Sequence, residues 1–147
     1  LSRADMSCGT ILTAGATLVA LPLINFGTSE QKEKYLRPLA EGKFVGAFGL
    51  TEPGAGSDAG ATQTTAVLDG DHYILNGRKC WITNGPTCDF AIVTAVTEKG
   101  KGTKGISTFI VESKDFLMVP MKIRWELEVP EHLILSLKTL KFQRKIY

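Results

Sequence analysis

The sequence predicts an α+β fragment, in which the end of an all-α helical domain is followed by a small antiparallel β-barrel domain. Residues 1–24 are rich in Ala, Leu, Ile and Thr and carry few charges, as a packed helix does. After Lys43 the sequence changes to short β-branched and aromatic runs separated by turn dipeptides, which is typical of antiparallel sheet. The expected parts of the chain are residues 1–42, 43–113 and a tail over 114–147.

Two helices joined by a short loop are expected before the sheet. The first, over residues 1–24, is apolar enough to be buried on most sides. The second can be capped by Thr28 or Ser29, and Glu30 favours its positive N-terminal end. Gly42 follows as the residue that ends it.

Six strands are expected next, and their spacing favours a small barrel or sandwich. Dipeptides that accept positive φ at tight turns separate several of them. The candidate strands are residues 44–50, 62–68, 72–75, 78–83, 89–96 and 105–112, and the turn dipeptides are Asp69-Gly70, Asn76-Gly77 and Asn84-Gly85.

Composition and charge argue against several classes of protein. The formal net charge is only +2, and the excess lies in residues 121–147, so the body of the chain has no basic stripe for nucleic acid. Three cysteines without a C-x-x-C pair and two distant histidines suggest neither a disulfide framework nor a metal site. The longest apolar stretch, Ile11 to Phe26, has 16 residues, fewer than the roughly 20 that span a bilayer.

A glycine-rich loop provides the sharpest local signal. It reads GLTEPGAGSD over residues 49–58, with hydroxyls at Thr51 and Ser57, and such a loop lets backbone N–H groups approach a ligand closely. A plain glycine-rich hairpin connection is the alternative. The spacing matches neither a dinucleotide-binding fingerprint nor a P-loop nor a serine-hydrolase elbow.

A second signal is WITNG at residues 81–85. Tryptophan is most often a core residue, which is the simpler interpretation. If residues 78–83 form a strand, alternation places Trp81 and Thr83 on the same face. An indole beside a hydroxyl would suit a flat cofactor that forms hydrogen bonds.

Four blocks together resemble the acyl-CoA dehydrogenase family, of the short-chain, butyryl-CoA type. They are FGLTEPGAGSD at 48–58, DGDHYILNG at 69–77, WITNG at 81–85 and KGTKGISTFIVE at 101–112. The stretch INFGTSEQKEKYLRPLA at 24–40 is similar to the end of that family's N-terminal helical domain. The resemblance covers about residues 1–113, so the chain is expected to be a fragment of a longer enzyme.

The resemblance implies an FAD site. In such a site Phe48 and Leu50 contact the flavin, and Thr51 forms a hydrogen bond to its pyrimidine end. Ser57 touches both FAD and the acyl-CoA substrate. Trp81 packs on one flavin face, and Thr83 forms a hydrogen bond near N5. The implied cofactor-binding residues are Phe48, Leu50, Thr51, Ser57, Trp81, Ile82 and Thr83, with Ser57 also binding substrate.

The implied reaction is α,β-dehydrogenation of a short-chain acyl-CoA to a trans-2-enoyl-CoA, followed by electron transfer to electron-transfer flavoprotein. The family's base is a Glu in a C-terminal helical domain that this chain lacks, so no catalytic residue is assigned and the chain alone is expected to be inactive. Glu52 does not replace this base, because in the family the Glu of the Leu-Thr-Glu motif belongs to the binding loop and because surface glutamates are usually solvated.

The parent enzyme is expected to be a homotetramer, located in the cytoplasm of a bacterium or in the mitochondrial matrix of a eukaryote. The alternatives are an acyl-CoA oxidase, a flavin monooxygenase or a non-enzymatic binding module.

The tail departs from the family pattern. Residues 121–147 contain no glycine and hold six Lys or Arg against three Glu. One alternative reading frame permits the family-like segments MGIRG and VPKENL, so a frameshift near residues 114–121 is hypothesised. The alternative is a genuine amphipathic segment suited to a membrane surface or a partner's groove. An unselected tail would leave sheet edges unpaired and favour aggregation.

Overall fold

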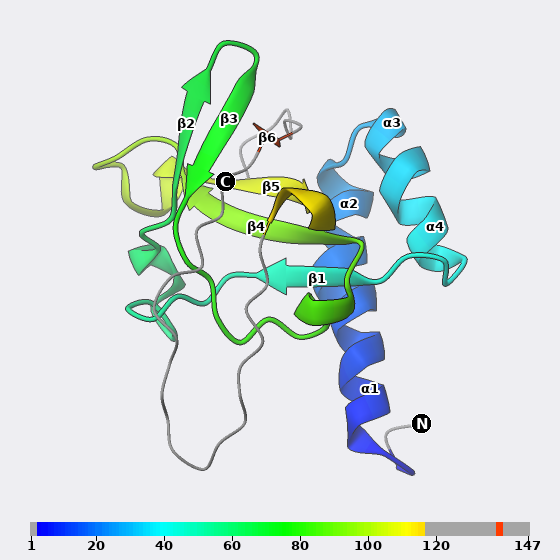
Figure 1. Cartoon of the computed structure of the whole chain (residues 1–147). Coiled ribbons are helices and arrows are strands. Elements are labelled where there is room, and N and C mark those ends of the chain that lie inside the picture. The colour runs from blue at the N-terminus through cyan, green and yellow to red at the C-terminus, as the bar shows by residue number, and fades with distance from the viewer. Residues whose placement is uncertain (1–2, 117–137, 140–147) are drawn as a thin grey trace.

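The computed structural model describes residues 3–116 and the backbone of residues 138–139. Helices come first, and a sheet follows (Figure 1). The hypothesised frameshift and the amphipathic alternative concern residues that lie almost wholly outside the described ones. Of the predicted tail, the structure includes a short 3-10 helix, Ser113–Asp115, and strand β6 (Lys138–Thr139).

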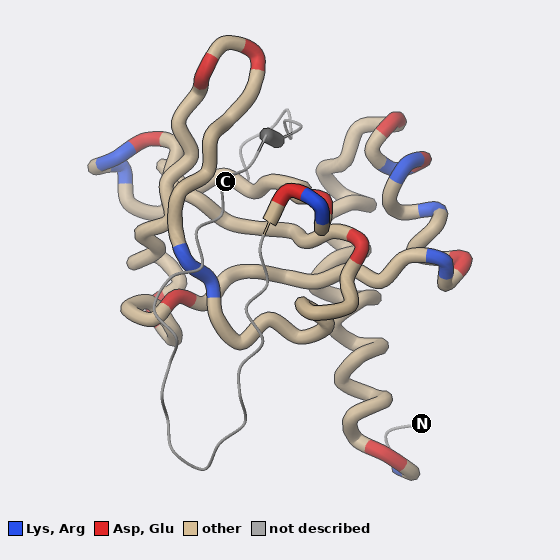
Figure 2. The backbone as a smooth tube through the Cα atoms, viewed as in Figure 1, with Lys and Arg blue, Asp and Glu red and all other residues tan. Residues whose placement is uncertain are grey.

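The first helix runs without interruption from Met6 to Phe26. It consists of α1 (Met6–Thr13), a π-helical stretch (Ala14–Ala20) and α2 (Leu21–Phe26). The Asp5 side chain caps it by accepting a 2.7 Å hydrogen bond from the Ser7 N–H. The helix itself carries no charged residue (Figure 2).

Two expectations about this helix are wrong. Only Ala14, Val19 and Leu23 are buried, so among the described residues it is not covered on most sides. The apolar segment is also longer than expected, because a helix of 21 residues with a mean hydropathy of 1.7 is long and apolar enough to cross a membrane by length and composition. Val19 and Leu23 are fully buried against other elements of the fold, as in the core helix of a globular domain.

The second helical segment begins where the sequence predicts. It consists of α3 (Ser29–Gln31), a π-helical stretch (Lys32–Leu36) and α4 (Arg37–Ala40). Thr28 and Gln31 form a capping box, in which the Gln31 N–H donates to Thr28 Oγ1 over 3.2 Å and the Thr28 N–H donates to Gln31 Oε1 over 2.9 Å. Gly42 follows the helix at φ +70°, as expected.

The sheet has the strand order β1-β4-β2-β3-β6, with β5 on the other edge of β4. Strands β4 and β5 pair antiparallel along their whole length, and β2 and β3 form an antiparallel hairpin that extends beyond the rest of the sheet (Figure 1). The strands are β1 (Gly46–Gly49), β2 (Thr65–Asp69), β3 (His72–Asn76), β4 (Phe90–Val96), β5 (Ile106–Glu112) and β6.

The predicted antiparallel barrel is not confirmed by the described residues. The described sheet is open, and β1 and β2 both pair with β4 in parallel. Parallel pairing requires a long connection rather than a tight turn, and the segment between Gly49 and Phe90 provides it. The α+β class is confirmed.

Two further predictions about the segment after β3 are wrong. Residues 78–83 do not form a strand, and Asn76-Gly77 does not form a tight turn. Gly77 is instead a site of close approach, because a Cβ there would collide with the side chain of Thr64. The other predicted turns form, with Gly70 at φ +61° and Asn84 at φ +67°.

Strand β4 divides the core into two clusters because its side chains alternate between the faces of the sheet. Phe90 and Ile92 pack with Val19, Leu23 and Tyr35 from the helices. The intervening residues of β4 pack with the hairpin and β5 in a second cluster, whose buried members include Ala66, Leu75, Ala91, Val93, Ala95, Phe109 and Val111. The helices therefore cover one face of the sheet.

Candidate functional site

One edge of β4 is shared by two strands that part from each other. Strand β1 pairs with β4 from Phe90 to Val93, whereas β2 meets β4 only at Val96. The Val96 N–H also donates to the Thr64 carbonyl over 2.7 Å. Thr94 therefore lies at a fork between β1 and β2, and the glycine-rich loop bridges this fork.

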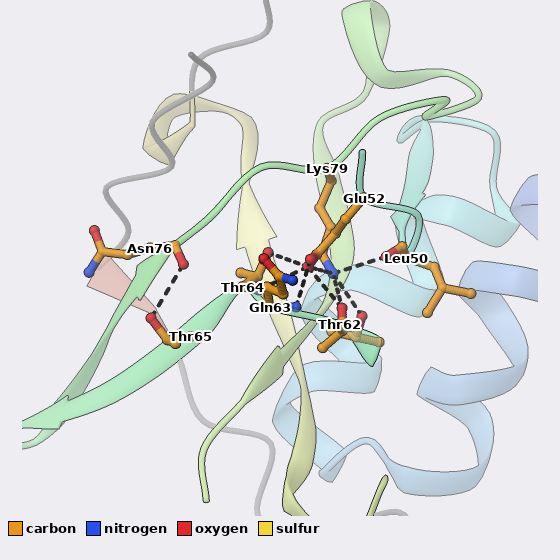
Figure 3. Close-up of polar contacts among 9 residues, drawn as sticks. Leu50, Glu52, Thr62, Gln63, Thr64, Thr65, Asn76 and Lys79 are labelled. Atoms are coloured by element: carbon orange, nitrogen blue, oxygen red, sulfur yellow. Dashed lines mark hydrogen bonds and ion pairs between the residues drawn. The ribbon is translucent and has the colours of Figure 1, made fainter. Parts of the chain in front are cut away.

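A buried ion pair fills the fork. Lys79 and Glu52 have side chains that are 0% and 5% exposed, and Lys79 Nζ lies 2.7 Å from Glu52 Oε1. The same ammonium group donates to the Leu50 carbonyl over 3.0 Å, to Thr62 Oγ1 over 2.8 Å and to Thr94 Oγ1 over 3.2 Å (Figure 3). The lysine thus contacts both branches of the fork and β4 between them.

Glu52 receives hydrogen bonds on both carboxylate oxygens. Thr62 and Thr64 donate their hydroxyls to Oε1 over 2.8 Å and 2.5 Å, and the Thr64 N–H donates to it over 3.0 Å. The Gln63 N–H donates to Oε2 over 2.6 Å. The expectation that Glu52 is solvated is therefore wrong.

These contacts determine the ionisation of the pair. Burial by itself raises the pKa of Glu52, but the hydrogen bonds from Lys79, from Thr64 and from the backbone N–H groups outweigh burial and lower the pKa to about 2. Burial lowers the pKa of Lys79, and the nearby Glu52 carboxylate opposes that effect. Because Glu52 is already paired and fully hydrogen bonded, it is unsuited to accept a proton from a substrate.

A second set of contacts joins the segment after Gly77 to β1. The Cys80 N–H donates to the Thr51 carbonyl over 2.8 Å. Further on, Asn84 Nδ2 donates to the Gly46 carbonyl over 3.2 Å. Residues 79–84 therefore run antiparallel to residues 46–52 along the edge of β1 that β4 leaves free.

This arrangement brings six of the seven predicted cofactor-binding residues to one edge, from Phe48, Leu50 and Thr51 on one side to Trp81, Ile82 and Thr83 on the other. Phe48 and Ile82 are half-buried and pack against opposite core clusters. Ser57 is exposed further along the loop. Among the described residues, no hydrogen bond connects Ser57 to this edge.

Trp81 is the most unusual of these residues. Its side chain is 68% exposed, and its backbone has φ +57°, which a bulky residue rarely adopts. Trp81 is thus not the core residue that the simpler interpretation expects. The strand alternation expected to align Trp81 with Thr83 is absent, because no strand forms there.

The chemistry of this edge suits a flat ligand. An exposed indole can stack on an aromatic ring. Within residues 3–116, the hydroxyls of Thr51, Ser57 and Thr83 form no hydrogen bond, so they remain available to ring nitrogens or carbonyl oxygens of a ligand. No group of three potential metal-ligating side chains occurs among the described residues, and Cys8, Cys80 and Cys88 are free thiols.

Sequence reasoning missed Lys79 and its threonine partners. A lysine between Arg78 and Cys80 gives no sign of being buried, because most lysines are exposed. Thr62 and Thr64 share a face by alternation, yet nothing in the sequence places that face against Glu52. Only the fold brings these residues together.

Comparison with known proteins identifies two matched domains. The family model of the acyl-CoA dehydrogenase middle domain matches residues 47–125, and that of the acyl-CoA dehydrogenase N-terminal domain matches residues 1–43. The short-chain-specific acyl-CoA dehydrogenase of Clostridium acetobutylicum is 54% identical over 112 residues, covering 76% of this chain and 30% of the relative. The CarC subunit of the caffeyl-CoA reductase–Etf complex of Acetobacterium woodii is 56% identical over 113 residues. The match covers 77% of this chain and 30% of CarC.

Solved structures show the same likeness. Butyryl-CoA dehydrogenase from Megasphaera elsdenii matches with a TM-score of 0.76 and 49% identity, covering 78% of this chain and 30% of that one. The FAD complex of PigA matches with a TM-score of 0.79 and 32% identity. The match covers 97% of this chain and 38% of PigA. Relatives are found in bacteria and, as mitochondrial proteins, in mammals. The chain spans about 30% of the length of the curated relatives it matches.

Proposed function

The chain belongs to the acyl-CoA dehydrogenase family, and we propose that it supplies the flavin-facing edge of an enzyme that acts on a short-chain acyl-CoA. The reaction is α,β-dehydrogenation to the trans-2-enoyl-CoA. The observation that supports this proposal is the pairing of residues 46–52 with 79–84, which brings the segment of the exposed Trp81 alongside the segment of Thr51.

Each predicted site residue has a role in this proposal. Trp81 packs on one face of the flavin ring system, and Thr51 and Thr83 donate or accept hydrogen bonds at its edge. Phe48, Leu50 and Ile82 supply apolar contacts along this edge. Ser57 lies on the glycine-rich loop, where FAD and the acyl-CoA would meet. Bound FAD supplies the hydride acceptor.

Removal of the α-proton requires a carboxylate base and donors that polarise the thioester carbonyl. Glu52 does not fit this role, since its oxygens are occupied by Lys79 and by loop donors. We propose that the base is supplied by a part of the enzyme other than the residues that the structure describes. The chain alone is expected to give no turnover with butyryl-CoA, and FAD-dependent dye reduction by it would contradict this.

The proposed partners follow from the relatives. Electron-transfer flavoprotein is the electron acceptor, an assignment supported by the name of the Etf-complex subunit CarC. The intact enzyme is proposed to be a homotetramer, cytoplasmic in a bacterium or in the mitochondrial matrix of a eukaryote. An acyl-CoA oxidase or flavin monooxygenase of the same architecture would differ by rapid reaction of the reduced intact enzyme with oxygen.

Reduction of an enoyl-CoA is a second candidate, because a relative at 56% identity is named a caffeyl-CoA reductase subunit. The same strand edge would serve either direction. Assays of the intact enzyme with butyryl-CoA and an electron acceptor, and with a 2-enoyl-CoA and an electron donor, would separate the two directions.

Flavin binding by the 147-residue chain tests the proposal. The chain contains two tryptophans, so a Trp125→Phe background makes Trp81 the only fluorophore of its kind. Titration with FAD should quench Trp81 fluorescence to saturation, and the companion Trp81→Leu variant should lose most FAD binding, measured by flavin fluorescence. If the folded chain binds no FAD, or if Trp81→Leu binds as well as the parent, a non-enzymatic module becomes the better interpretation.

A further inference from the structure

The Lys79–Glu52 pair lies behind the candidate site rather than in it. Both side chains are buried, whereas the neighbouring Trp81 side chain is exposed. In the sequence, Glu52 directly follows Thr51, and Lys79 lies two residues before Trp81. Each member of the pair is thus attached to one of the two segments that carry the proposed flavin contacts.

The contacts between these segments interlock. Lys79 Nζ reaches the Leu50 carbonyl over 3.0 Å and Glu52 Oε1 over 2.7 Å, on either side of Thr51. Between these two contacts, the Cys80 N–H donates to the Thr51 carbonyl over 2.8 Å. Three consecutive residues of the loop are therefore held by two consecutive residues of the opposite segment, which limits both sliding and rotation.

The pair also sets the width of the fork between β1 and β2. Thr94, on β4, and Thr62, on the returning loop, both accept hydrogen bonds from Lys79 Nζ (Figure 3). The aliphatic part of the Lys79 side chain packs on β1. The Cγ of Lys79 lies 3.4 Å from the position that a Cβ on Gly49 would occupy. Replacement of the lysine or the glutamate is therefore expected to shift the loop relative to β1.

The backbone of Trp81 needs such support. A tryptophan at φ +57° holds a conformation that bulky residues avoid, so it persists only where the surrounding contacts impose it. The contacts that immediately precede it are those of Lys79 and Cys80. Without them the segment is free to relax, and the backbone of Trp81 would shift relative to Thr51.

We propose that Lys79 and Glu52 are positioning residues for the flavin, which hold the indole of Trp81 and the hydroxyl of Thr51 at a set separation without touching the cofactor themselves. This inference rests on the proposed flavin site. Buried ion pairs contribute little net stability compared with well-packed apolar residues, so a pair kept in this place is better explained by the geometry that it imposes.

A double variant separates positioning from stability. Removing one partner leaves the other buried and unpaired, which destabilises the fold, so Lys79→Met and Glu52→Gln are combined in the 147-residue chain with Trp125→Phe. The double variant should fold, yet bind FAD at least about tenfold more weakly than the parent. Glu52→Asp, which keeps the charge but withdraws the carboxylate, should fold and give an intermediate loss.

Tyr35→Phe provides the matched control. It removes a hydrogen bond to Glu112 on the helical side of the sheet, so it lowers stability without touching the fork. Its affinity for FAD should equal that of the parent. If the folded double variant and Glu52→Asp also bind FAD with the parent's affinity, the pair has only a structural role and the proposal is overturned.

A measurement without flavin keeps this inference distinct from the proposed function. The fluorescence anisotropy of Trp81 should fall in the double variant and in Glu52→Asp, because the indole gains mobility, and should stay unchanged in Tyr35→Phe. Unchanged anisotropy in the folded variants would refute the positioning role. Absence of FAD binding by the parent chain would instead count against the flavin site, while the anisotropy would still decide whether the pair holds Trp81.

Discussion

The hydroxyl of Tyr35 donates a hydrogen bond of 2.9 Å to Oε1 of Glu112 and so joins the second helical segment to the end of β5. Lys34 Nζ lies 2.7 Å from the same oxygen, and Lys114 pairs with the other one. The ring of Tyr35 packs on Phe90 with the ring centroids 5.1 Å apart. Tyr35 thus connects the second helical segment to the sheet in two ways, through the packing of its ring and through the hydrogen bond of its hydroxyl.

Removing the hydroxyl of this buried tyrosine should destabilise the chain. Tyr35→Phe is expected to lower the free energy of unfolding by about 1 kcal/mol, because a hydrogen bond to a charged group is lost while the ring packing remains. Urea denaturation followed by circular dichroism measures this. Lys34→Met should cost less, about 0.5 kcal/mol, since Lys34 is half exposed. A larger cost for Lys34→Met than for Tyr35→Phe would contradict the assignment.

Acid should weaken the fold through Glu52. Its pKa is about 2 in the folded chain against 4.5 in the unfolded one, so its contribution is fully present above about pH 4.5 and is lost as the pH falls towards 2. The shift corresponds to about 3 kcal/mol. Glu112 acts in the same window, because hydrogen bonds from Lys114 and Lys34 lower its pKa to about 2.

The measurement is the free energy of unfolding between pH 2 and 6. The Glu52→Gln/Lys79→Met variant should lose less stability over this range than the parent chain, since it has one titrating carboxylate fewer. Equal slopes for the two proteins would show that Glu52 does not titrate as its hydrogen bonds imply.

Gly46 allows the first helix to approach β1. A Cβ at this position would lie 2.6 Å from Cγ1 of Val19, which is fully buried. Gly46→Ala should therefore destabilise the chain by about 1–3 kcal/mol. Gly56→Ala, where nothing lies within 4 Å of the added atom, should change stability by less than about 0.5 kcal/mol. Adding Val19→Ala to Gly46→Ala should cost less than the two single changes together, and strict additivity would argue against the steric clash.

The backbone of Trp81 predicts an unusual order among its variants. Glycine adopts φ +57° freely and alanine does not, so Trp81→Gly should be more stable to urea than Trp81→Ala by about 1 kcal/mol. In an ordinary extended segment the order would be reversed, because glycine loses more conformational entropy on folding. Both variants lack the indole, and both should bind FAD poorly. Greater stability of Trp81→Ala would show that the backbone is not held at positive φ.

Local signals in the sequence predicted local structure well. The Thr28 cap, the end of the helix at Gly42 and the hairpin at Asp69-Gly70 all form as expected, because each depends on a few neighbouring residues. The predicted site residues stay a prediction, although six of them lie along one strand edge. The predicted barrel is not confirmed and the strand over 78–83 is wrong, since strand pairing and its direction depend on partners far away in the chain.

By itself, the sequence determined that helices precede the sheet, the turns at Asp69-Gly70 and Asn84-Gly85, and the family, since capping residues, turn dipeptides and motif blocks are written in consecutive residues. Tertiary structure alone decided that Glu52 is buried and that Lys79, 27 positions away, neutralises it. A charge can leave water only where another chain segment supplies its partner and its hydrogen bonds. That condition depends on how β1 and β2 part along β4, which no local pattern encodes.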